Sequence, residues 1–343
     1  MPVARILFTL PLPEPFDYAV PEGMEIAEGS YVAAPVGKYD RLGIVVEILP
    51  DAAGEGRALK EVAEVYPVPP MTAAMRDFLS FSARYTVSHP GQLLSMALRA
   101  RGGLLPSPTE TVYEATGAMP ARMTEAREKV LEAAGQSDAL TAAELAQAAG
   151  VSSGVVKGLA EAGALRALEM LSDPPFPKPD PDLPGADLTA EQEEAAEALR
   201  AAARAGGFQP FLIDGVTGSG KTEVYFEAIA ETLKADPEAQ VLVLLPEIAL
   251  TQAILSRFEA RFGAPPAPWH SGLPTRSGGG PGARRRMGGR GSIGARSALL
   301  LPFRKLKLVI VDEEHDGSFK QEEGVTYHAR DMAVMRAKPR TPR

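Results

Sequence analysis

Residues 215–222 read GVTGSGKT, a glycine-rich segment that ends in lysine and threonine. The apolar run FQPFLID precedes this segment, and the helical pattern KTEVYFEAIAETLKA starts at its end. Glycines at these positions let backbone amides turn inward around phosphate groups, and the dipole of the following helix favours negative charge at its start. A strand, a tight loop and a helix in this order predict an α/β domain that binds nucleotide phosphates.

The loop supplies most of the predicted ATP-binding residues, which are Gly215, Thr217, Gly218, Ser219, Gly220, Lys221 and Thr222. Lys221 is expected to reach the β- and γ-phosphates, and the Thr222 hydroxyl is expected to ligate Mg²⁺. Gln192 lies 23 residues before Gly215, in a helical segment, and its amide is expected to hydrogen-bond the adenine edge. The plain alternative is that Gln192 is one of the glutamines that surface helices often carry.

Residues 307–311, KLVIV, form a continuous apolar run that leads into Asp312 and Glu313. Strands buried on both faces have such a composition, and ligands of open α/β sheets bind at the carboxyl ends of the strands. We therefore expect Asp312 to hold Mg²⁺ and Glu313 to polarise the water that attacks ATP. Together with Lys221 they are the predicted catalytic residues, although each acid taken singly also fits a solvated strand end.

Two further units precede this domain. Residues 1–105 begin with the β-type runs ARILFTL, SYVAAPV and LGIVVEIL and continue with a helical stretch. The positions expected to be buried in that stretch are Met75, Phe78, Leu79, Leu93, Leu94 and Leu98. Residues 120–170 carry a helix–turn–helix pattern, with Thr141 as N-cap and Gly150 as helix end, which predicts a winged-helix domain. Residues 171–188 are rich in proline and predict an extended linker, and residues 189–343 alternate strands with helices.

Composition narrows the class of protein. The chain has no cysteine, which excludes disulfides and cysteine-based zinc sites. No apolar run approaches the roughly 20 residues of a membrane-spanning helix, and the N-terminus lacks the features of a secretion signal. A cytoplasmic protein with no membrane partner is therefore expected. The net charge of −8 argues weakly against nucleic acid as a partner, yet residues 260–311 contain many arginines and no acid.

Several segments together resemble one family of superfamily 2 helicases, the PriA (primosomal protein N′) family of replication restart. They are PFDYAVPEG (15–23), GVTGSGKTEVY, LPEIALTQ, the HSG at 270–272, IGARSALLLPF (293–303) and the stretch from DEEH at 312–315 to residue 337. The resemblance implies a multidomain α/β fold: an N-terminal β-rich DNA-binding domain, a winged helix and a RecA-like parallel α/β helicase lobe. It also implies an ATP-dependent 3′→5′ DNA helicase that acts in primosome assembly at stalled forks.

The resemblance assigns DNA contacts to particular residues. A pocket for the 3′ end of a DNA strand is expected at Phe16, Asp17, Tyr18, Gly37 and Lys60. For Phe16 and Tyr18 the alternative is an ordinary place in the core of a strand. The GARSA segment, with Arg296, resembles a contact to the single-strand backbone, and residues 316–321, with Phe319, resemble a loop that couples DNA contact to hydrolysis. Implied partners are forked and single-stranded DNA, primosome-loading proteins and single-strand-binding protein.

The chain departs from the family pattern in two ways. Family members continue with a second motor lobe and a cysteine-rich zinc insertion, so we expect an incomplete, truncated lobe here and no zinc in this chain. Residues 274–292 and 338–343 are rich in glycine, proline and arginine, and a gene read out of frame is favoured over a basic DNA-contact loop. The competing functions are a non-catalytic fork-binding module and an unrelated phosphate-loop ATPase.

Overall fold

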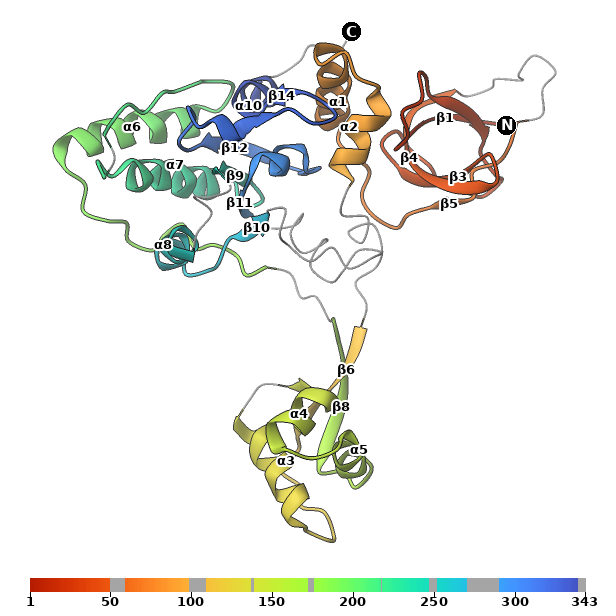
Figure 1. Ribbon diagram of the computed structural model, residues 1–343. Coiled ribbons are helices and arrows are strands. Elements are labelled where there is room, and N and C mark those ends of the chain that lie inside the picture. The colour runs from red at the N-terminus through yellow and green to blue at the C-terminus, as the bar shows by residue number, and fades with distance from the viewer. Residues whose placement is uncertain are drawn as a thin grey trace. The chain divides into compact units, whose positions relative to one another are not determined.

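The chain divides into two units in the computed structural model (Figure 1), one made of Met1–Pro106 with Pro175–Arg343 and one of Ser107–Pro174. The structure describes residues 1–49, 59–98, 109–136, 139–171, 176–216, 218–246, 252–269 and 290–338. The larger unit holds an N-terminal β domain, a helical pair and a parallel sheet. The smaller unit combines helices with a short antiparallel sheet.

The N-terminal strands form a small curled sheet, which Figure 1 shows as a ring. They are β1 (Val3–Phe8), β2 (Phe16–Ala19), β3 (Tyr31–Val36), β4 (Tyr39–Leu49) and β5 (Glu64–Val65), in the order β2-β1-β4-β3-β5. The segment before β5 closes the ring, because Ala19 N–H donates to Lys60 O at 2.9 Å and Val62 N–H donates to Ala19 O at 3.1 Å. Side chains of alternating strand residues fill the interior, as the period of two requires. The three predicted strand runs are confirmed.

Helices α1 (Ala73–Tyr85) and α2 (Pro90–Ala97) follow this ring of strands β1–β5, which we call the barrel. Thr72 caps α1, since its Oγ1 accepts a hydrogen bond from Met75 N–H at 3.2 Å. The apolar positions recur every three or four residues, so they share one face of each helix. All six side chains that the sequence places in the core of this stretch are buried.

The third part of the chain contains a parallel sheet in the order β10-β11-β9-β12. Its strands are β9 (Gln240–Leu244), β10 (Ala267–Trp269), β11 (Gly291–Gly294) and β12 (Leu306–Val311). Helices α7 (Lys221–Ala235) and α8 (Gln252–Phe262) pack with Val241 and Val243 on one face of β9. Leu242 and Leu244 face a second core on the other side. Both faces are covered, which explains why the apolar run of β9 is continuous.

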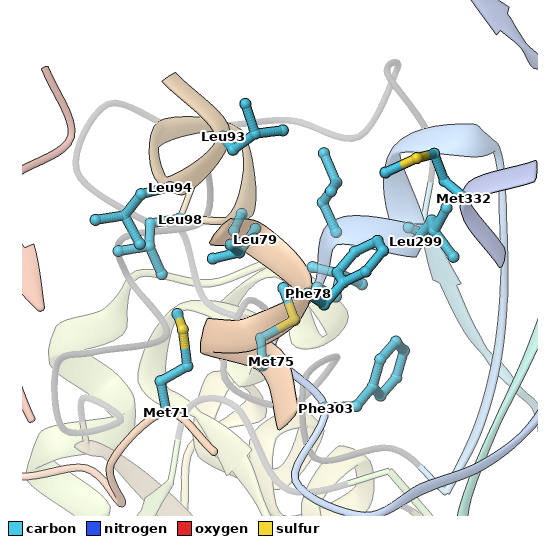
Figure 2. Packing of buried hydrophobic residues seen from close by; sticks show 14 of the residues in the cluster. Met71, Met75, Phe78, Leu79, Leu93, Leu94, Leu98, Leu299, Phe303 and Met332 are labelled. Carbon is cyan, nitrogen blue, oxygen red and sulfur yellow. The ribbon is translucent and has the colours of Figure 1, made fainter. Parts of the chain in front are cut away.

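The second core joins the helical pair to the parallel sheet (Figure 2). It includes Phe78 of α1, together with residues of the short helix η3 (Arg296–Leu300) and of α10 (Ala329–Ala337). The guanidinium carbon of Arg336 lies 5.5 Å from the centre of the Phe78 ring and 5.3 Å from that of Phe303. Arg336 also donates hydrogen bonds to the carbonyl oxygens of Leu299 and, at 2.7 Å, Leu301. The N-terminal region and the sheet therefore share one apolar core.

The strand predicted at residues 208–214 is wrong. The structure gives this segment no strand, and Phe211 and Leu212 are 50% and 80% exposed. Among the described residues β12 ends the sheet, with β9 as its one hydrogen-bonded neighbour. An apolar run indicates extended backbone, but a strand also needs a partner for its N–H and C=O groups, and the run does not specify that partner.

The described part of the proline-rich segment contacts the helices of the sheet, and its role as a linker stays a prediction. Asp180 N–H donates to Phe262 O at 2.8 Å, and Arg261 Nη1 donates to Leu183 O at 2.7 Å. Lys234 pairs with Asp182 at 3.1 Å. Residues 176–188 are therefore tied to α7 and α8 rather than free. Helix α6 (Ala190–Ala205), which follows, is joined to α7 by ion pairs of Arg200 and Arg204 with glutamates of α7.

In its described residues the smaller unit contains three helices and a sheet in the order β7-β6-β8. Its elements are β6 (Thr109–Ala115), α3 (Glu125–Gln136), β7 (Leu140–Thr141), α4 (Ala142–Ala149), α5 (Ser153–Glu161) and β8 (Leu165–Leu171). Thr141 Oγ1 accepts from Glu144 N–H at 3.3 Å, and Gly150 ends α4 with a φ of 65°. The predicted helix–turn–helix pair is confirmed as α4 and α5. Across the described ranges, the structure contains no helix that is long and apolar enough to cross a membrane.

Candidate nucleotide site and DNA-contact surfaces

The glycine-rich loop leads directly into α7, which begins at Lys221. Gly218 and Gly220 both have a φ of 81°, a left-handed conformation that favours glycine. A Cβ on Gly220 would also lie 2.4 Å from Nε2 of Gln192, so a larger residue here would displace the Gln192 amide. Gly215 and Ser219 lie in the same turn, and Thr217 lies outside the described residues.

Lys221 folds back over its own loop. Its Nζ donates to Gly215 O at 2.7 Å and to Val216 O at 3.3 Å. The ammonium group has three donor hydrogens and no acceptor, so it can exchange these carbonyl contacts for phosphate oxygens. The predicted phosphate-binding lysine is thus at the mouth of the loop, and Thr222 follows it in the first turn of α7.

Gln192 connects α6 to the loop. Its Oε1 accepts a hydrogen bond from Thr189 N–H at 2.8 Å, and its Nε2 donates to Ser219 O at 2.8 Å. The first contact belongs to a capping box, a Thr-x-x-Gln pattern that is visible in the sequence. Both ends of the amide are therefore engaged with the protein in this structure, and contact with adenine stays a prediction.

Asp312 extends from the end of β12 toward α7. Its Oδ2 accepts a hydrogen bond from the Tyr225 hydroxyl at 3.1 Å, and its Oδ1 accepts from Glu313 N–H at 3.0 Å. Tyr225 is buried, and burial, together with the charge of Asp312, raises the pKa of its hydroxyl. The structure thus brings Asp312 to the helix that carries Lys221 and Thr222. Tyr225 is absent from the sequence prediction, although its place three residues after Thr222 puts both on one helix face.

The two residues after Asp312 have distinct surroundings. Glu313 has a φ of 49°, which is uncommon for a residue with a side chain and is characteristic of functional turns. Its Oε2 lies 3.7 Å from His315 Nε2. Glu314 instead pairs with Arg330 of α10 at 2.8 Å. Of Glu313 and Glu314, it is therefore Glu314 that is paired with an arginine, and Glu313 that lies near a histidine.

Arg296 lies at the start of η3 and contacts the loop that follows the acids. Its Nη1 donates to Ser318 O at 2.8 Å and to Lys320 O at 2.7 Å. These carbonyls flank Phe319 in η4 (Gly317–Phe319), whose side chain is buried in the second core. The structure therefore links the two segments that were predicted to contact DNA and to couple it to hydrolysis. The Phe319 ring faces protein rather than solvent.

Four of the five residues predicted at the 3′-end pocket lie on the inner side or at one end of the barrel. Tyr18 is in the barrel core and donates from its hydroxyl to Pro35 O at 3.0 Å. Phe16, two residues earlier on the same face, packs edge-on against Phe8 and remains half-exposed. Lys60 Nζ lies 3.5 Å from the carbonyl oxygen of Gly37, which turns the β3–β4 hairpin.

Asp17 is the exception. Strand alternation places it on the opposite face of β2 from Phe16 and Tyr18. There it accepts hydrogen bonds from Arg5 Nε at 2.9 Å and Arg5 Nη2 at 3.4 Å, and Arg5 also pairs with Glu47. A carboxylate has about four lone-pair positions, so these contacts leave it able to accept a further donor. Asp17 therefore lies on the other face of β2 from Phe16 and Tyr18, and its place in one pocket with them stays a prediction.

Several other segments singled out in the sequence lie outside the described residues. They are residues 247–251 of the LPEIALTQ segment, the HSG at 270–272, most of the glycine- and arginine-rich stretch at 274–292, and residues 339–343. Four arginines of residues 260–311 are described, and two of them are engaged with acids. Arg261 pairs with Glu227 at 3.0 Å, and Arg290 pairs with Glu238.

Two family models match separate parts of the chain. Residues 5–99 match the PriA family described as 3′DNA-binding domain (3′BD). Residues 189–341 match the family described as DEAD/DEAH box helicase. The first range covers the barrel with α1 and α2, and the second runs from the capping residue of α6 to beyond α10.

The chain is also similar to individual PriA proteins over most of its length. The chain is 30% identical over 345 residues to the replication restart protein PriA of Rickettsia conorii, covering 98% of this chain and 41% of that protein. It is 31% identical over 355 residues to PriA of Haemophilus influenzae, covering 98% and 47%. With PriA of Bacillus subtilis it shares 41% identity over 211 residues, covering 58% and 25%. The chain spans less than half the length of these relatives. It belongs to the family of the replication restart protein PriA, with a 3′ DNA-binding domain followed by a DEAD/DEAH box helicase domain.

Proposed function

We propose that this chain provides the ATP-binding lobe and the 3′-end-binding domain of a 3′→5′ DNA helicase that acts in replication restart. The observation that carries the proposal is the contact between Tyr225 of α7 and Asp312 at the end of β12, at 3.1 Å. It joins the phosphate loop to the acidic strand end within one site. The lobe would be RecA-like, with Lys221, Asp312 and Glu313 as its catalytic residues.

Magnesium fits the residues at this site. A threonine hydroxyl and a carboxylate are oxygen ligands, which suit Mg²⁺, and Thr222 and Asp312 would hold the ion. When bound, Mg²⁺ neutralises charge on the β- and γ-phosphates. Lys221 would bind the same phosphates, and Glu313 would orient the attacking water. The described ranges contain no group of three or more His, Cys, Asp or Glu side chains that could hold a metal ion.

Forked DNA with a free 3′ end is the proposed substrate class. The 3′ end would bind at the barrel, where Phe16, Gly37 and Lys60 mark one end, while Asp17 would accept a hydrogen bond from the 3′-hydroxyl. Arg296 would contact the single strand through its Nε and Nη2, because its bonds to Ser318 and Lys320 use Nη1. Single-strand-binding protein and primosome-loading proteins are proposed partners on the strength of the family alone.

For the smaller unit we propose a winged-helix domain. Support comes from the α4–α5 pair and from β8, which pairs antiparallel with β6 over Leu165–Leu171. The second helix of the pair, α5, offers a single cation, Lys157. We therefore propose that this domain serves as a spacer or protein contact more than as a reader of DNA sequence.

ATP hydrolysis separates the helicase proposal from a non-catalytic fork-binding module. We expect the chain to hydrolyse ATP in a Mg²⁺-dependent manner, with and without a forked DNA that has a free 3′-hydroxyl. Glu313→Gln should remove this hydrolysis while leaving ATP bound, because the amide cannot polarise water as the carboxylate does. Hydrolysis no faster than that of Glu313→Gln under both conditions, with intact DNA binding, would favour the non-catalytic module.

Tyr225→Phe tests the link between the loop and the acid. Removing the hydroxyl takes one donor from Asp312 and leaves the ring packed, so the fold should be unchanged. A hydrogen bond to a charged group contributes about 1.5–3 kcal/mol, and we expect Mg²⁺-dependent ATP affinity to fall several-fold. ATP affinity in the absence of Mg²⁺ should change little. An equal loss with and without Mg²⁺ would contradict a positioning role for Tyr225 at the metal ligands.

A further inference from the structure

A second exposed aromatic ring lies beside the proposed 3′-end site. Tyr39 opens β4 directly after the turn at Gly37 and Lys38, and it is 67% exposed. The guanidinium carbon of Arg41 lies 5.3 Å from the centre of the Tyr39 ring. This distance is that of a cation–π pair, so Arg41 holds the ring in place while much of its surface faces solvent.

The strand register places this pair on the same side of the sheet as Phe16. Tyr39 is paired with Val36, and Arg41 is paired with Ala34, whose side chain is in the barrel core. Residues directly opposite each other in antiparallel strands share a face. Tyr39 and Arg41 therefore lie on the face of the sheet that lines the barrel interior, next to the turn between β3 and β4.

The register also places both rings at the same end of the barrel. β1 pairs antiparallel with β2 and β4, so its carboxyl end meets the start of both strands. Phe16 is the first residue of β2, and Tyr39 is the first residue of β4. The half-exposed Phe16 ring and the exposed Tyr39 ring thus lie toward the same end of the barrel.

Three cations, Lys38, Arg41 and Lys60, lie at or next to the turn between β3 and β4. The ion pairs formed within the described ranges do not include Lys38, Arg41 or Lys60, and Lys60 Nζ lies against the carbonyl oxygen of Gly37. Four described carboxylates are near in sequence, and two of them, Glu14 and Glu61, are exposed. Asp40 alternates to the other face of β4, and Asp17 is held by Arg5. Cations that form no ion pair within the described ranges, next to an aromatic ring, are the elements from which single-strand sites are built.

We propose that Tyr39 and Arg41 form a second nucleotide subsite, which takes the nucleotide next to the 3′-terminal one. The Tyr39 ring stacks on the base, and Arg41, with Lys38 and Lys60, contacts the phosphates. The ligand class is single-stranded DNA of any sequence, because every base presents an aromatic face. The inference rests on the proposed 3′-end site and adds residues to it.

The test uses the full chain and a 5′-fluorescein-labelled thymidine oligonucleotide of about ten nucleotides with a 3′-hydroxyl, a length within the range of known single-strand sites. Tyr39→Ala should weaken binding about fivefold or more, the loss expected when a base loses its stacking partner. Tyr39→Phe should retain the affinity, because the ring and not the hydroxyl makes the contact. Tyr85→Ala is the matched control, since Tyr85 of α1 is 60% exposed; it should bind as the unmodified chain does.

The outcomes separate this subsite from the 3′-end site on which it rests. Tyr39→Ala should keep the preference for a 3′-hydroxyl over a 3′-phosphate end, whereas Asp17→Ala should lose that preference. If Tyr39→Ala binds like Tyr85→Ala while Asp17→Ala loses the preference, the second subsite is overturned and the 3′-end site stands. If the unmodified chain binds 3′-hydroxyl and 3′-phosphate ends equally, the proposed 3′-end site is wrong. If Tyr39→Ala still weakens binding in that case, Tyr39 contacts single-stranded DNA in general, and its assignment to the nucleotide next to the 3′ terminus is overturned.

Discussion

Phe78→Ala should lower the free energy of unfolding of the larger unit by about 3–5 kcal/mol, the usual cost of removing a buried aromatic ring. Phe78 is 2% exposed, and its ring contacts the guanidinium of Arg336 in α10. The truncation would open a cavity where α1 meets the helices of the parallel sheet (Figure 2). The measurement is urea unfolding followed by the fluorescence of Trp269, the single tryptophan of the chain, which packs against the same core.

Phe211→Ala provides the matched control for this experiment. Phe211 lies in the extended segment before the phosphate loop and is 50% exposed, so its truncation should change the unfolding free energy by less than about 0.5 kcal/mol. Similar small losses for both variants would contradict a core shared by the N-terminal region and the parallel sheet. A large loss for Phe78→Ala alone would show that Trp269 in β10 senses a residue of α1.

Lys221→Ala should raise the dissociation constant for Mg²⁺-ATP at least about tenfold, which corresponds to about 1.4 kcal/mol. The Lys221 ammonium lies over the loop, on the carbonyl oxygens of Gly215 and Val216, where phosphate oxygens can replace these contacts. Alanine leaves the glycine turn unchanged and removes the positive charge. Titration with a fluorescent ATP analogue measures the effect.

Lys234→Ala serves as the control, because Lys234 lies in the last turn of the same helix and pairs with Asp182. Its removal changes the net charge equally but leaves the loop untouched, so ATP affinity should stay the same. A Lys221→Ala variant that is folded and binds ATP as tightly as the unmodified chain would show that the loop does not hold the phosphates.

The sequence predicted those elements whose signal is local. Thr141 and Gly150 are a cap and a helix end, and both positions act as expected. The periodic apolar residues of α1 and α2 are buried because one helix face must leave water, whatever it packs against. What the sequence did not show is that this face would pack against η3 and α10, some 200 residues later in the chain. Contacts of that kind depend on tertiary structure and leave no local pattern.

In the candidate site, too, some residues follow from local motifs and others only from the tertiary structure. The loop and the acids of β12 follow from motifs, and the structure adds Tyr225, whose hydroxyl connects them. Asp17 and Phe16 are neighbours in sequence, yet adjacent strand residues face opposite sides. A pocket assembled from consecutive residues therefore needs the strand register, and Tyr39 becomes a candidate through the register of β3 with β4.

The end preference of DNA binding tests most directly the central claim, that this chain recognises the 3′ end of a DNA strand. Two oligonucleotides that differ only in a 3′-hydroxyl or a 3′-phosphate are titrated against the full chain. We predict tighter binding of the 3′-hydroxyl end, because the Asp17 carboxylate can accept a hydrogen bond from a hydroxyl and repels a phosphate. Asp17→Ala should abolish the difference, and Asp40→Ala, a nearby exposed acid on β4, should preserve it. Equal affinity of the unmodified chain for the two ends would contradict the account.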